Sequence, residues 1–177
     1  MHDTYRGLTK ILWGFLFVLI DINIEYVDII PDFVGYAMIA YGLMQLDFER
    51  ERNWAVAIAF ISFPAFFIPK ANGADPMSYN GDYFLNSLYY TGLGVLHLIL
   101  MYLIISRLIK VAESKGQFEV SQKARTRLML YVGLSIFALV GFPLGEMLGF
   151  LLIIAVIFLL IMEIVMLVLI AEFRKVL

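Results

Sequence analysis

The chain has 177 residues, of which 62% are hydrophobic and 16% are charged, and its formal net charge at pH 7 is −2. Soluble domains are typically about half apolar and about a quarter charged, so this composition predicts one domain with a large lipid-facing surface. The absence of cysteine excludes disulfides, thiolate metal sites and a cysteine nucleophile.

The first apolar run follows Arg6 and Lys10. No small-residue cleavage motif follows it and acidic residues come next, so we expect a retained membrane span and not a cleaved signal peptide. Hydropathy predicts six spans in all, at residues 8–26, 31–47, 54–69, 84–106, 127–143 and 146–171.

Four carboxylates, Asp21, Glu25, Asp28 and Asp32, separate the first two spans with spacings of 4, 3 and 4. On a continuous helix they would share one face. Counted as helix from Lys10, Asp21 would lie ~16 Å deep in the membrane. A charge at that depth is costly and indicates a functional site.

Pro31 predicts instead that the helix breaks and restarts there, with Asp32 beside the positive end of the second helix. Asp28 and Asp32 then need no explanation beyond a solvated loop and a helix cap. Asp21 and Glu25 remain candidates for binding a cation through oxygen ligands or for relaying protons. Asn23, Asp28 and Asp32 are secondary candidates, and the sequence leaves the identity of any metal or cofactor open.

Basic residues predict the orientation of the chain. With six spans, twelve of the thirteen lysines and arginines fall on one side, and Lys70 is the exception. The positive-inside rule then places both termini in the cytoplasm of a multi-pass plasma-membrane protein. The basic segment 107–127 is helix-prone and broken at Gly116, and we expect it to extend the fourth and fifth spans and to contact anionic lipid headgroups, not nucleic acid.

Two polar residues occur inside otherwise apolar spans. His97 is near the middle of the fourth span, and Glu163 is in the sixth at a similar depth, so the two side chains could pair. One interpretation is a proton or ligand site between helices. The other is an interhelical hydrogen bond that only stabilises packing, by ~0.6 kcal/mol on average.

Small residues predict close helix packing. Gly35 and Gly42 are seven residues apart on the second span, and Gly145 and Gly149 open the sixth. Matching residues around Pro31 and Pro143 also make the hairpin of spans one and two a candidate parallel repeat of the hairpin of spans five and six.

The hairpin Ile29-Ile-Pro-Asp-Phe-Val-Gly-Tyr36, with Ala-Met-Ile-Ala-Tyr-Gly-Leu43 after it, resembles one found in small uncharacterised bacterial polytopic membrane proteins. The preceding Ile11-Leu-Trp-Gly-Phe-Leu-Phe and Leu19-Ile-Asp-Ile-Asn23 fit the same pattern, so the resemblance covers residues 1–46. It implies a bacterial plasma-membrane protein and carries no activity or catalytic residue with it.

Three functions fit these features. The first is a non-enzymatic accessory or regulatory component that contacts a membrane-protein partner or a second copy of the chain. The second is a small transporter, or a cation- or proton-binding protein, using Asp21, Glu25, His97 and Glu163. The third is an intramembrane enzyme with His97 and Glu163 as acid and base, which ranks last because phosphate-binding loops, zinc pairs and nucleophile elbows are all missing from the sequence.

Overall fold

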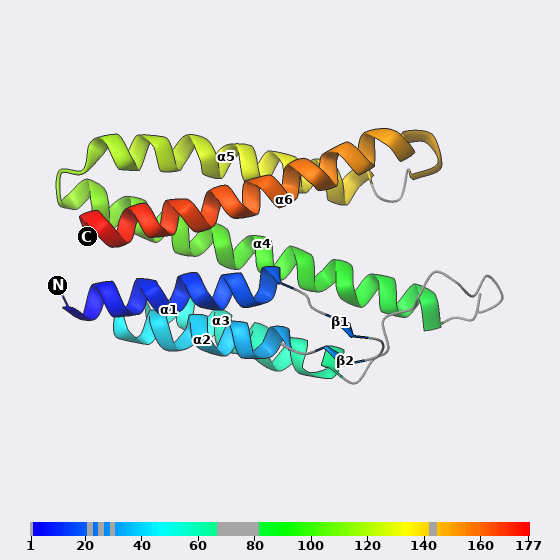
Figure 1. Cartoon of the computed structure of the whole chain (residues 1–177), viewed down its shortest axis with the longest axis horizontal. Helices are drawn as coiled ribbons and strands as arrows, with labels where there is room; N and C mark the ends of the chain where they lie inside the picture. Colours follow the sequence, from blue (N-terminus) through cyan, green and yellow to red (C-terminus); the bar gives the residue numbers. More distant parts are fainter. Residues whose placement is uncertain (1, 21–22, 25–26, 29–30, 67–81, 142–144) are drawn as a thin grey trace.

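Helices make up nearly all of the described chain, which confirms the predicted all-α class (Figure 1). The computed structural model describes all residues except 1, 21–22, 25–26, 29–30, 67–81 and 142–144. In chain order the elements are α1 (His2–Leu19), β1 (Asn23–Ile24), β2 (Val27–Asp28), α2 (Asp32–Gln45), α3 (Glu49–Ser62), the 3₁₀ turn η1 (Phe63–Phe66), α4 (Asp82–Ser114), α5 (Phe118–Gly141) and α6 (Gly145–Val176).

Three of these helices are long and apolar enough to cross a membrane, over Leu88–Ser114, Phe118–Gly141 and Gly149–Val176. The remaining ones are less typical of spans. Helix α1 carries Asp3, Arg6 and Lys10 within its 18 residues. Helices α2 and α3 have 14 residues each, or ~21 Å, whereas the hydrocarbon core is ~30 Å thick.

The first helix differs from the span predicted at 8–26. It begins at His2 and ends at Leu19, and the chain then forms a short antiparallel pair in which Asn23 faces Asp28 and Ile24 faces Val27. Backbone pairing between β1 and β2 therefore replaces the continuation of the helix. The depth calculated for Asp21 assumed a helix that continues past Leu19, and Asp21 itself lies outside the described residues.

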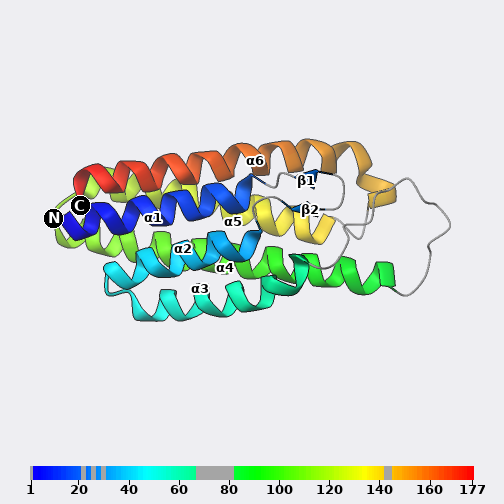
Figure 2. The same cartoon turned by 60° about the horizontal axis from the view of Figure 1, so that its bottom comes forward.

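Two tight turns close helices at the end of the bundle that carries both termini (Figures 1 and 2). Gly116 joins α4 to α5 with φ of 75°, and Asp47 joins α2 to α3 with φ of 55°. In each turn the next residue reaches back across the helix end, with Gln117 N–H donating to the carbonyl of Ala112 and Phe48 N–H to that of Leu43. The predicted break at Gly116 is confirmed. We call this end of the bundle the basic end.

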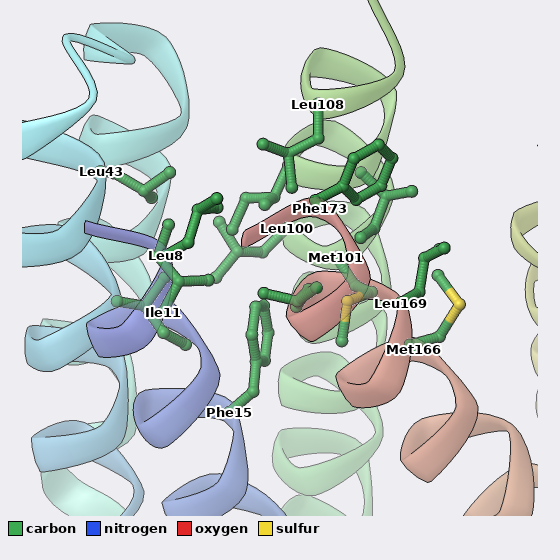
Figure 3. Packing of buried hydrophobic residues seen from close by; sticks show 14 of the residues in the cluster. Leu8, Ile11, Phe15, Leu43, Leu100, Met101, Leu108, Met166, Leu169 and Phe173 are labelled. Atoms are coloured by element: carbon green, nitrogen blue, oxygen red, sulfur yellow. The ribbon is translucent and has the colours of Figure 1, made fainter. Parts of the chain in front are cut away.

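The hydrophobic core is concentrated toward the basic end, where α1, α2, α4 and α6 meet (Figure 3). Its fully buried side chains include Leu8, Ile11, Leu43, Leu100 and Phe173.

Toward the opposite end the bundle opens. Both views show α4 and α6 diverging (Figures 1 and 2). Between residues 149 and 161 of α6, Ala155 is the one described side chain that is buried, and Phe150 is 76% exposed. One end of the bundle is therefore closely packed and the other is open.

Helices α1 and α2 cross at very short range through two pairs of glycines. A Cβ built on Gly14 would lie 2.6 Å from the carbonyl oxygen of Gly35, and one on Gly42 would lie 2.6 Å from that of Gly7. Backbone atoms cannot yield as a flexible side chain can, so both contacts require glycine.

The second hairpin lacks this packing. A Cβ on Gly133 or Gly149 would meet no described atom within 4 Å. Among the described atoms nothing packs closely on Gly149, and the surroundings of Gly145 lie outside the described part. At these glycines the two hairpins do not pack alike, so the crossing adds no support for a parallel repeat.

Replacing Gly14 or Gly42 with alanine should lower the free energy of unfolding by about 1–3 kcal/mol, because the new methyl group forces two backbones apart. Equilibrium unfolding in detergent measures this change. Gly133→Ala is the matched control and should be neutral or stabilising by up to ~1 kcal/mol, since alanine is the better helix former. Equal destabilisation by all three variants would contradict the close crossing.

Candidate functional site

His97 of α4 and Glu163 of α6 face each other in the interior of the bundle. The Nε2 atom of His97 lies 3.4 Å from Oε1 of Glu163, and the side chains are only 15% and 13% exposed. Both residues come from apolar helices of membrane length. The structure thus brings together the two polar residues that the sequence places at similar depth.

Two tyrosines that the sequence analysis missed extend this pair to four helices. The hydroxyl of Tyr36, on α2, lies 3.0 Å from Nδ1 of His97. The hydroxyl of Tyr131, on α5, donates a hydrogen bond to Oε1 of Glu163. The side chains of Tyr36 and Tyr131 are only 3% and 1% exposed. Together the four residues form a hydrogen-bonded chain, Tyr36–His97–Glu163–Tyr131, which we call the polar network.

Little in the sequence distinguishes these two tyrosines. The chain has ten tyrosines, and tyrosine is common both in apolar helices and at membrane interfaces. The available signal is the rule that a buried tyrosine hydroxyl needs a partner. That rule identifies a partner only once the helices are placed in space.

The glycine crossing holds one side of the network. Phe15 follows Gly14 and Tyr36 follows Gly35, and both aromatic rings contact His97. The Phe15 ring meets the imidazole edge to face, with centroids 5.5 Å apart and planes at 83°. Phe15 is itself buried in the core. The orientation of His97 therefore depends on how closely α1 approaches α2.

The network can satisfy its hydrogen bonds in two protonation states. With a neutral imidazole, Nε2–H donates to Glu163 and Nδ1 accepts the Tyr36 hydroxyl proton. With an imidazolium, Nδ1–H donates to the Tyr36 oxygen, and the hydroxyl proton rotates away. The heavy atoms need not move between the two states. Adding one proton at Nδ1 therefore keeps both ring nitrogens of His97 partnered, and the buried Tyr36 hydroxyl is then the donor that needs a new acceptor.

The other predicted site residues lie elsewhere or beyond description. Asp32 is the first residue of α2, one helical turn before Tyr36 and nearer the open end. Asn23 and Asp28 are partners in the short β pairing. Asp21 and Glu25 lie outside the described residues. Within the described part, no group of three or more His, Asp or Glu side chains is placed to hold a metal ion.

Comparison of the chain with protein-family models, with curated proteins and with solved structures found no match. The fold and the polar network define a helical protein that has three helices of membrane length and a protonatable pair between them.

Tyr131 and Glu163 should be energetically coupled. In a double-mutant cycle, Tyr131→Phe and Glu163→Gln should be non-additive by about 0.5–3 kcal/mol in the free energy of unfolding, because the first removes the hydrogen bond and the second weakens the same bond by removing the charge of its acceptor. Glu172→Gln is the control for the same helix, since Glu172 pairs with Arg127 and not with Tyr131. Tyr131→Phe and Glu172→Gln should be additive, and additivity in both cycles would show that the network bond contributes nothing.

Proposed function

We propose that this chain is a six-span protein of the plasma (inner) membrane with both termini in the cytoplasm. Both termini and the turns at Asp47 and Gly116 lie at the basic end, which supports the positive-inside orientation (Figure 1).

The short helices are compatible with this topology. Helix α3 continues directly into η1, so that helical backbone extends over residues 49–66. Helix α2 packs against both α1 and α3, which covers part of its surface and leaves Val34, Tyr41 and Met44 exposed. A short span is accommodated by local thinning of the bilayer or by packing against neighbours, at a modest cost.

Cysteine labelling tests the orientation, because the chain has no native cysteine to interfere. In spheroplasts, Asn80→Cys should react with a membrane-impermeant maleimide, whereas Lys115→Cys should react only after the membrane is opened. The cysteine-free parent is the control for background labelling. The reverse pattern would overturn the orientation.

We propose further that the protein is non-enzymatic and acts as a small proton-linked transporter, with the His97–Glu163 pair as its proton-binding site. The observation that carries this proposal is the hydrogen-bonded chain of four side chains from four helices, in the interior of helices that are otherwise apolar. Charged groups at such positions are costly and typically mark ion or proton pathways.

A proton suits this site better than a metal cation. Oε1 of Glu163 already accepts from Tyr131 and lies beside Nε2 of His97. Hard cations need about six to eight oxygen ligands, whereas the network supplies one carboxylate, one imidazole and two hydroxyls. The added proton would reside on Nδ1 of His97, facing Tyr36, while Glu163 balances the imidazolium charge.

The position of the network favours access from the open end. His97 and Glu163 keep a small exposed fraction, and beyond them α4 and α6 diverge (Figure 2). Below them, toward the basic end, Leu100, Met101, Met166 and Leu169 are fully buried. Proton uptake from the open side, followed by release through a rearranged basic end, is the alternating access that a proton-linked transporter requires.

Proton movement into proteoliposomes that enclose a pH-sensitive dye tests this function. The parent protein should move protons under an imposed membrane potential, and Glu163→Gln should reduce the rate to that of protein-free vesicles, because the amide cannot balance an imidazolium. Glu172→Gln, a carboxylate change on the same helix outside the network, should retain the parent rate.

Two outcomes would count against the proposal. A folded Glu163→Gln protein that moves protons at the parent rate would show that the pair is not the site. A parent that moves no protons under any ion gradient would leave the network as a packing element. The accessory or regulatory function would then be the better account, and a stable co-purifying membrane partner would support it.

A further inference from the structure

A second polar feature lies on the basic-end side of the network and shares none of its four residues. A cleft of about 1010 Å³ opens between the α2–α3 turn and helix α5, and α4 forms its floor. Its lining comes from three segments that are distant in the sequence: residues 47–51, 102–110 and 125–133.

Charges of opposite sign occupy different walls of this cleft. The turn and the start of α3 contribute the carboxylates Asp47, Glu49 and Glu51, together with Arg50. The floor and the opposite wall contribute cations only, namely Arg107, Lys110 and Arg125.

Within the part of the chain that the structure describes, no ion pair joins the two walls. Arg125 pairs with Glu113, which lies outside the cleft, at 2.9 Å, and both side chains are well exposed. Arg107 stacks over the ring of Phe48, 5.3 Å from its centroid. The carboxylates of one wall and the cations of the other therefore form no ion pairs with each other in the described part of the chain.

The cleft is apolar where it runs away from the basic end. On α4, Tyr102 and Leu103 precede the cations by one to two turns, and on α5, Met129 and Val132 follow Arg125 by one to two turns. The helices run in opposite directions, so the charged positions share one level and the apolar positions share the next. Met129 is 67% exposed, and a Cβ on Gly133 would meet no described atom within 4 Å.

We propose that this cleft binds one membrane phospholipid whose headgroup carries both a phosphate and a primary amine. The phosphodiester lies against Arg107, Lys110 and Arg125, which supply charge-assisted hydrogen bonds. The ammonium faces the carboxylates of the α2–α3 turn. An acyl chain follows the apolar lining into the membrane.

The lining charges favour this headgroup over a purely anionic one. The four lining cations (Arg50, Arg107, Lys110, Arg125) are balanced by the three lining carboxylates together with Glu113, which pairs with Arg125, so the site has no net charge to favour an anionic lipid. A headgroup with one phosphodiester and one amine is likewise neutral, and its amine meets the carboxylates, which would otherwise repel the phosphate. The apolar lining adjoining the charges favours a lipid over free phosphate.

Native mass spectrometry of the purified full chain in detergent tests the assignment. The protein is supplied with equal amounts of phosphatidylethanolamine, phosphatidylglycerol and phosphatidylcholine. Phosphatidylethanolamine should be retained several-fold more than either of the others, because only its headgroup combines a phosphodiester with an amine that donates hydrogen bonds. Excess inorganic phosphate should not displace it.

Two variant pairs separate the roles of the walls. Arg107→Gln with Lys110→Gln should reduce retention of all three lipids, and Asp47→Asn with Glu49→Gln should abolish the preference for phosphatidylethanolamine over phosphatidylglycerol. Lys110→Gln alone should show the first effect if the stacking of Arg107 on Phe48 proves necessary for folding. Lys123→Gln with Glu119→Gln, an exposed pair outside the cleft, is the matched control and should behave as the parent.

Three results would overturn the proposal. Retention that is the same in the cation variants and the control would show that the lipid binds elsewhere. Tighter retention of phosphatidylglycerol than of phosphatidylethanolamine would exclude the amine contact. Displacement by inorganic phosphate would identify a free-anion site. Glu163→Gln should retain lipid as the parent does, so failure here is distinguishable from failure of the proton site.

Discussion

The close approach of α1 and α2 at Gly14 and Gly35 is the constraint on which the interior of the bundle depends. A Cβ added to either glycine would clash with the backbone carbonyl oxygen of the other. The residues that follow these glycines, Phe15 and Tyr36, are thereby both brought into contact with the His97 ring. A wider crossing would withdraw the Tyr36 hydroxyl from Nδ1 and leave the imidazole without one of its two partners. Packing between two short helices, α1 and α2, thus determines the hydrogen bonding of His97 on a third helix.

The polar network in turn explains how a histidine and a glutamate persist in apolar helices. A buried charge or polar group is tolerated when it is hydrogen-bonded, and each ring nitrogen of His97 has a polar atom beside it. The network lies at the boundary between the closely packed basic end and the open end. In the proposed function, this position would let one proton reach the site from the open end, while Leu100, Met101, Met166 and Leu169 are fully buried on its other side. The same asymmetry leaves the charged cleft at the basic end, where lipid headgroups are expected.

Sequence reasoning reached the helical class and the pairing of His97 with Glu163, because apolar composition reports lipid-facing surface directly and polar residues are rare in such runs. It failed where non-local contacts decide the outcome. Helix α1 ends at Leu19 because Asn23 and Ile24 pair with Asp28 and Val27. Hydropathy could not predict this ending, since the apolar β-branched residues of that stretch fit a helix equally well. The roles of Tyr36 and Tyr131 could not be predicted from the sequence, because they depend on how four helices are placed relative to one another. The cleft is formed by three segments that are distant in the sequence, and no local sequence pattern predicts that they lie side by side.

The central claim is that the His97–Glu163 pair gains and loses a proton inside an otherwise intact bundle. Nitrogen NMR of ¹⁵N-histidine-labelled protein in lipid measures it most directly, because the chain has only two histidines and a His2→Gln variant leaves the signals of His97 alone. The account predicts that changing the pH of the sample converts the ring between imidazole and imidazolium, and that in Glu163→Gln the ring stays neutral. A parent ring that keeps one charge state and one tautomer throughout would contradict the account.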